Sequence, residues 1–99
     1  MKTFFCKLIA PRASFARDMN TAEAKVMQDH AVYWRGKMEQ GKVVTFGLVA
    51  DPAGAYGIGI IEVETEAEAG ALTSNDPAIL SGRGFRYDIQ PMPMGSVHR

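Results

Sequence analysis

The chain has 99 residues, 46% of them hydrophobic, which suffices for one domain with a modest core and leaves no room for a second. Its 11 basic and 11 acidic residues balance, without a dense basic segment, so nucleic acid is excluded as an expected partner. No apolar run approaches the roughly 20 residues that cross a bilayer, and the N-terminus is too strand-like for a secretory signal. The single cysteine cannot form an internal disulfide, and we expect a cytoplasmic protein.

Residues 2–10 predict the first strand. Their sequence KTFFCKLIA favours β-structure, ends at Pro11 and places Phe4, Cys6 and Leu8 on one face. Because Cys6 alternates within this strand, we interpret it as an inert core residue rather than a nucleophile.

Residues 11–19 predict a loop, because they combine a proline, a serine and two arginines without a sustained hydrophobic period. A loop of this length justifies considering a functional role. Its two guanidinium groups, Arg12 and Arg17, are candidates for holding an anionic group of a substrate, and solvated surface charges are the ordinary alternative.

A long helix is predicted from Thr21 to Gly41. Asn20 followed by Glu23 resembles a capping box, and the missing Cβ of Gly41 suits a helix C-terminus. Helical spacing predicts a core stripe of Met27, Ala31, Trp34 and Met38, with an adjoining stripe of Val26, His30, Tyr33 and Lys37. His30 therefore lies at the edge of the predicted buried face.

Residues 42–50 and 57–64 predict the second and third strands, joined as an antiparallel hairpin. The turn begins at Asp51 and contains Pro52, which has no amide hydrogen for a ladder, and Gly54, which permits a positive φ. Strict alternation in the second strand predicts one face of Val44, Phe46, Leu48 and Ala50 and another of Val43, Thr45, Gly47 and Val49.

The last third of the chain predicts two short helical segments and a final strand. Thr65 opens a helix over 65–72 with a repeated capping pattern, and Asp76 followed by Pro77 opens a brief helical turn. The remaining predicted elements are that turn over 78–80, a strand over 85–90 and an extended tail over 92–99, with Pro91 and Pro93 preventing ordinary strand pairing.

The order βαββαβ predicts the ferredoxin-like α+β fold, an antiparallel sheet with two helices on one face. The first two strands run parallel through a right-handed helical crossover. The second and third strands carry apolar residues on both faces, whereas two helices cover only one. We therefore expect a homodimer in which a second copy covers the other sheet face, with an interface above roughly 1,000 Å².

The chain contains four informative segments, which are MQDHAVYWRGKMEQGKVVTFG, VADPAGAYGIGIIEVETEAEA, NDPAILSG and FRYDIQPMPM. Together they resemble the YciI-related (YCII domain) proteins, small members of the dimeric α+β barrel group. The resemblance extends from about Phe4 to Met94. It implies a single YCII-like domain over residues 1–99 and a ferredoxin-like dimer.

The resemblance also implies an active site made from a helix histidine and an aspartate after the second strand, which map onto His30 and Asp51. Antiparallel packing of the helix on that strand places the two in one neighbourhood. If they meet, the carboxylate orients the imidazole and fixes its tautomer, which leaves the other nitrogen to exchange a proton with the substrate. Tyr33, beside His30 on the helix, joins Arg12 and Arg17 as a substrate-binding candidate.

Two functions are compatible with these residues. The resemblance implies a cofactor-free and metal-free enzyme with lyase- or isomerase-type proton transfer on small cyclic or aromatic acids or hydroxyquinones. The alternative is a non-catalytic small-molecule-binding or dimeric interaction module. Each residue also has a structural interpretation: Asp51 as a turn residue, Asp76 of the family's aspartate-proline pair as a helix cap, and His30 as a structural side chain.

Overall fold

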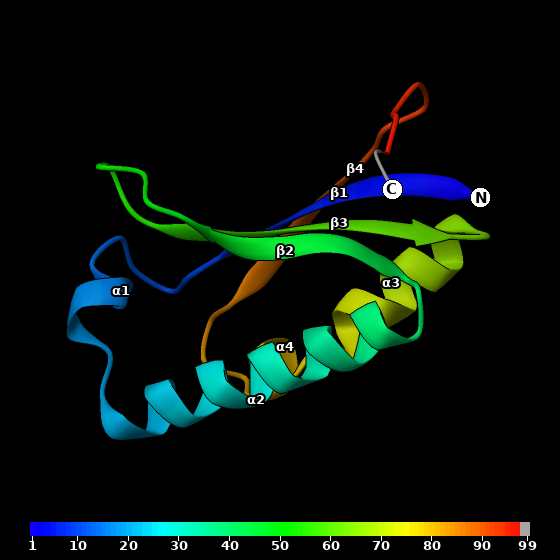
Figure 1. Cartoon of the computed structure of the whole chain (residues 1–99). Coiled ribbons are helices and arrows are strands. Elements are labelled where there is room, and N and C mark those ends of the chain that lie inside the picture. Colours follow the sequence, from blue (N-terminus) through cyan, green and yellow to red (C-terminus); the bar gives the residue numbers. More distant parts are fainter. Residues whose placement is uncertain (98–99) are drawn as a thin grey trace.

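Four strands form one antiparallel sheet, and α2, α3 and α4 lie along one of its faces (Figure 1). The computed structural model describes residues 1–97, so the last two positions of the predicted tail, His98 and Arg99, lie outside the described residues. The elements are β1 (Lys2–Ile9), α1 (Phe15–Asp18), α2 (Thr21–Glu39), β2 (Val43–Val49), β3 (Tyr56–Val63), α3 (Glu66–Ser74), α4 (Pro77–Leu80) and β4 (Arg86–Pro91). The strand order is β2-β3-β1-β4, which confirms the predicted ferredoxin-like α+β arrangement.

The predicted helix starts are confirmed by their caps. At the start of α2, the Asn20 side chain accepts a hydrogen bond from the Glu23 amide at 2.8 Å, and the Asn20 amide donates to the Glu23 carboxylate at 2.9 Å. Thr65 Oγ1 accepts from the Glu68 amide at 3.1 Å ahead of α3. The chain leaves α2 through Gly41 with φ of 79°, a conformation that glycine adopts at little cost.

One helix lies where a loop was predicted. Phe15–Asp18 forms the short helix α1, and the Phe15 side chain is only 5% exposed. Its ring packs edge-on against Phe85, with 5.1 Å between the ring centroids. Arg12, just before α1, binds both Asp18 and Glu23. Phe85 and Glu23 lie outside this segment, so the local hydrophobic period could not indicate the helix.

Trp34 occupies the centre of the core between α2 and the sheet. It is 1% exposed and packs with Phe4, Cys6 and Ile61, among other buried residues. Met38, predicted to share its stripe, is instead 36% exposed, because it lies in the last turn of α2 beside the exposed Glu39. The predicted core stripe therefore holds at its middle and fails at its end.

A β-bulge changes the predicted faces of β2. Val43 pairs with Ile61, but Thr45 pairs with Ile60, so Val44 is an extra residue in the strand. Val43 consequently shares the helix-covered face with Phe46 instead of lying opposite to it, and it is 6% exposed.

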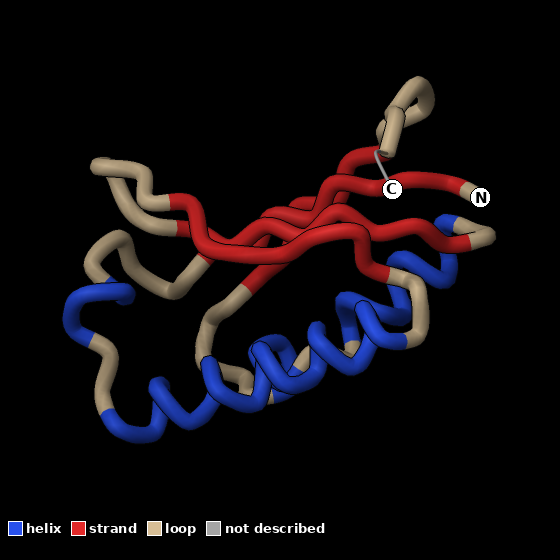
Figure 2. The backbone as a smooth tube through the Cα atoms, in the orientation of Figure 1, coloured by secondary structure: helices blue, strands red, loops and turns tan. Residues whose placement is uncertain are grey.

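The end of β4 also departs from expectation. Pro91 pairs with Phe4 inside the strand, and the Met92 amide donates to the Thr3 carbonyl at 2.8 Å, so the two prolines do not end strand pairing early. A proline is tolerated there because β4 is an edge strand and its missing donor faces no neighbour. The segment that follows rises on the side of the sheet away from the helices (Figure 2).

Candidate active site

The carboxylate of Asp76 is the centre of a buried hydrogen-bond cluster beneath α2. Asp76 is 0% exposed and forms the N-cap of α4, where its Oδ1 accepts from the Ala78 amide at 2.8 Å. Its other oxygen, Oδ2, accepts from three side chains on two different elements. The predicted helix cap is therefore confirmed, and it uses only one of the two carboxylate oxygens.

Three donors converge on Asp76 Oδ2. His30 Nδ1 and Trp34 Nε1, which are neighbours on α2, each lie 2.8 Å from this oxygen. The Tyr87 hydroxyl, on β4, lies 2.5 Å from it. Trp34 Nε1 also lies 3.0 Å from the Tyr87 hydroxyl, so these two donors contact each other as well as the acceptor.

The protonation states in this cluster follow from its geometry. Burial acts to raise the pKa of Asp76, but hydrogen bonds from His30, Tyr87 and the Ala78 amide outweigh it and hold that pKa below its ordinary value. Burial and the adjacent Asp76 charge raise the pKa of Tyr87, so its phenol keeps its proton and donates. An ionised carboxylate only accepts, so His30 Nδ1 carries a hydrogen and Nε2 of the neutral ring is a free acceptor.

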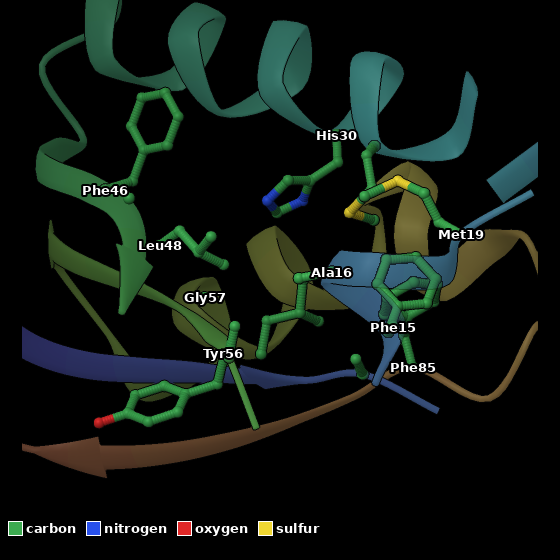
Figure 3. A pocket seen from close by; sticks show the side chains of 14 residues that line it. Phe15, Ala16, Met19, His30, Phe46, Leu48, Tyr56, Gly57 and Phe85 are labelled. Carbon is green, nitrogen blue, oxygen red and sulfur yellow. The ribbon is translucent and has the colours of Figure 1, made fainter. Parts of the chain in front are cut away.

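His30 forms part of the wall of a cavity of about 300 Å³. Figure 3 shows its ring pointing from α2 into this space, between Phe46 and Leu48 on one side and Met19 and Phe15 on the other. The lining is almost entirely aromatic and aliphatic, and the Tyr56 hydroxyl points away from His30 (Figure 3). The imidazole is thus the one titratable group that the lining presents next to a bound ligand.

Asp51, the predicted partner of His30, does not reach it. Asp51 is exposed in the turn between β2 and β3, where its Oδ1 accepts from the Ala53 amide at 2.8 Å. The carboxylate on His30 Nδ1 belongs instead to Asp76, which approaches because α4 packs beneath α2. The structure therefore pairs the helix histidine with the aspartate of the aspartate-proline pair.

The three predicted substrate-binding residues lie outside the cavity lining. Arg12 Nη1 and Nη2 donate to the Glu23 carboxylate at 2.8 and 2.9 Å, and Arg12 also binds Asp18. Arg17 is exposed on α1. Tyr33 donates from its hydroxyl to the Leu72 carbonyl at 2.6 Å and lines a separate groove. None of them lines the cavity beside His30.

Sequence reasoning missed Tyr87 and Trp34 as members of the site. Alternation in 85–90 places Tyr87 on the same strand face as Phe85, and helical spacing places Trp34 in the core. Both patterns indicate burial, and a buried hydroxyl or indole needs an acceptor. The sequence did not show that the acceptor of both is Asp76.

Cys6 is confirmed as a core residue. It is 0% exposed and free, and burial raises its pKa to about 12, so the thiol is not a nucleophile near neutral pH. Over residues 1–97, no three or more His, Cys, Asp or Glu side chains gather in a way that could hold a metal ion. Within the same residues, no helix is long and apolar enough to span a membrane.

The fold and the site define a class: a small ferredoxin-like protein with a histidine-aspartate pair at the wall of an apolar cavity. The family follows from comparison with known proteins. Residues 3–93 match the YCII-related domain, and the chain belongs to that family. A search of the curated proteins found no match.

Proposed function

We propose that this YCII-related protein is a small enzyme that transfers a proton on a small ring-shaped ligand, with His30 as the base and Asp76 as its orienting partner. One observation carries the proposal: the imidazole is fixed through Nδ1 to a fully buried carboxylate while its ring lines an otherwise apolar cavity. The scheme uses only side chains of this chain. The resemblance to the family supports lyase- or isomerase-type chemistry.

The geometry supports a simple sequence of proton movements. Nε2 takes a proton from the ligand, and the imidazolium that forms is stabilised by the Asp76 charge at Nδ1. In an isomerisation, the same proton returns to another atom of the ligand, so no atom is gained or lost. In an elimination, a leaving group takes the bonding electron pair and departs with the proton. The apolar lining beside the imidazole and the full burial of Asp76 strengthen the attraction between imidazolium and carboxylate.

Deuterium exchange tests this proposal without knowledge of the natural substrate. Cyclohexanone and resorcinol exchange ring hydrogens in D2O by base catalysis, and NMR follows the loss of each signal. We expect the wild-type protein to accelerate exchange, and His30→Ala to reduce that acceleration by about 10²- to 10⁴-fold, the usual contribution of a positioned base. Lys25→Ala, an exposed change on the same helix, should keep the wild-type rate.

The alternative is a module that binds a ligand without catalysis, and the nearly complete apolar lining of the cavity favours retention of such a ligand. The exchange experiment separates the two functions. Equal exchange rates for the wild type and His30→Ala would contradict the role of His30. Binding of either probe without accelerated exchange would replace the enzyme by the binding module.

A homodimer is part of the proposal. The sheet face away from the helices carries half-buried Phe5, Ile58 and Ile60, and no helix covers it (Figure 1). Lys7 and Arg86 on this face are matched by Asp88 and Glu62, so a second copy meets no excess of one charge. A face of this kind fits another copy of itself.

We also propose a cytoplasmic setting, which suits the free thiol of Cys6.

A further inference from the structure

We infer that Tyr87 is a positioning residue that tunes the basicity of His30 by competing with it for one oxygen of Asp76. The inference rests on the proposed function, since it treats His30 as the base, but its test does not require turnover. Tyr87 lies on β4 and reaches the cluster from the sheet, whereas His30 reaches it from α2. The two side chains meet only through the carboxylate.

The competition follows from the number of donors on a single oxygen. Asp76 Oδ2 accepts from His30, Trp34 and Tyr87, while Oδ1 accepts from the Ala78 amide. Each donor draws negative charge from the carboxylate and so weakens its attraction for the others. The Tyr87 hydroxyl donates to the same oxygen as His30 and so withdraws charge from the bond that stabilises protonated His30.

The ionisable neighbours of His30 in this cluster keep one charge state near neutral pH. Burial raises the pKa of Cys6 on β1 to about 12, and burial and the Asp76 charge raise the pKa of Tyr33 on α2 above its ordinary value. The pKa of Tyr87 is raised as well, and that of Asp76 is lowered. Among these groups of the sheet, α2 and α4 around His30, only Asp76 is therefore charged, and its negative charge stays constant between about pH 5 and pH 8.

Removing the Tyr87 hydroxyl should make Asp76 a better acceptor for His30. In Tyr87→Phe the ring remains and only the competing donor is lost. Protonated His30 is then stabilised more strongly, so its ring signals should change at a pH about 0.5 to 1 unit higher than in the wild type, the equivalent of one hydrogen bond. Substitution of Tyr87 by 3-fluorotyrosine, a stronger donor, should move the change to lower pH.

A pH titration of the His30 ring followed by NMR measures this directly. Tyr33→Phe is the matched control, because its hydroxyl donates to the Leu72 carbonyl and not to Asp76, so it should leave the His30 titration where it is in the wild type. An unchanged His30 titration in Tyr87→Phe, or a change in the opposite direction, would overturn the inference, provided that the backbone amide spectrum shows the native fold. A purely structural Tyr87 would alter stability without moving the titration.

The outcomes also separate this inference from the proposed function. If Tyr87→Phe shifts the His30 titration while no protein variant accelerates deuterium exchange, the tuning is correct and the enzyme proposal fails. If the wild type accelerates exchange through His30 but Tyr87→Phe shifts neither the titration nor the pH dependence of exchange, the enzyme proposal survives and the tuning role is wrong.

Discussion

Asp76 has a structural role and, in the proposed function, a chemical one as well. One carboxylate oxygen caps the N-terminus of α4, and the other accepts hydrogen bonds from three side chains. The carboxylate is fully buried. Truncation in Asp76→Ala leaves these buried donors without an acceptor, and each such group costs about 1–3 kcal/mol. We expect a loss of at least about 3 kcal/mol in the free energy of unfolding, measured by urea denaturation. Tyr87→Phe, which removes one donor and keeps the ring, should cost about 1 kcal/mol. Equal losses in the two variants would contradict this account.

Glu23, in the first turn of α2, makes the stability of the protein depend on pH in the acid range. Hydrogen bonds from Arg12 and from the Asn20 amide lower the pKa of Glu23 from 4.5 to about 2. A carboxylate with a lowered pKa binds fewer protons when folded than when unfolded, so stability is present above pH 4.5 and is lost as the pH falls towards 2. Asp76 adds a loss of the same sign below its ordinary value of 3.8. Thermal melts from pH 6 to pH 2.5 should show this decline, and Glu23→Gln should flatten it. A decline of equal steepness in that variant would exclude Glu23 as a cause.

At the scale of elements, α1 is held in place by Arg12 and forms one wall of the cavity. Arg12 binds Asp18 at the end of α1 and Glu23 in the first turn of α2. Its guanidinium also lies over the ring of Phe15, which lines the cavity. Arg12→Ala should therefore increase hydrogen exchange of the backbone amides in residues 15–24. Arg17→Ala removes an exposed guanidinium from the same helix and should leave that exchange unchanged. Similar exchange in both variants would show that the ion pairs do not anchor α1.

Contact between α2 and β3 depends on one glycine. A Cβ on Gly59 would lie 2.3 Å from Trp34 Cζ3, and Trp34 cannot move without disturbing its bond to Asp76. Gly59→Ala should thus lower the free energy of unfolding by about 1–3 kcal/mol or more. Gly36→Ala in α2 has no atom within 4 Å of the new Cβ and should instead raise it by about 1 kcal/mol. Urea denaturation measures both, and a stable Gly59→Ala variant would contradict the close packing.

Elements were predictable where their signals are local. Asn20 followed by Glu23 and Asp76 followed by Pro77 each predict a helix start from adjacent sequence. Alternation in residues 2–10 predicts both faces of β1. The helix α1 was not predictable, because Phe15 is held by Phe85, far away in the sequence.

The site was predictable only in part, for the same reason. The sequence singled out His30 but paired it with Asp51 and interpreted Asp76 as a helix cap, whereas the chain folds so that α4 brings Asp76 to the imidazole. Antiparallel packing of α2 on β2 predicts one neighbourhood for His30 and Asp51 and says nothing of a third element beneath α2. Long-range packing therefore determined the partner.

At the scale of the whole molecule, the uncovered sheet face predicts association. We expect light scattering to show a dimer at micromolar concentration, because a face with Phe5, Ile58 and Ile60 is stabilised when a second copy covers it. Ile58→Glu should shift the protein to a monomer. Leu80→Glu, at a leucine that is 67% exposed on α4, is the matched control and should remain dimeric. A monomeric wild type would contradict the proposed interface.

The shared carboxylate of Asp76 also restricts how this protein can change over time. The residue that begins α4 is the residue that sets the histidine ring, so neither task can be altered without the other. A lineage that moves the proposed base must first find another way to start that helix, whereas the cavity walls come from α1, which carries Phe15, and from β2, which carries Phe46 and Leu48, so they can vary separately. Such a molecule would keep the proposed chemistry constant and diversify in the ligands it admits.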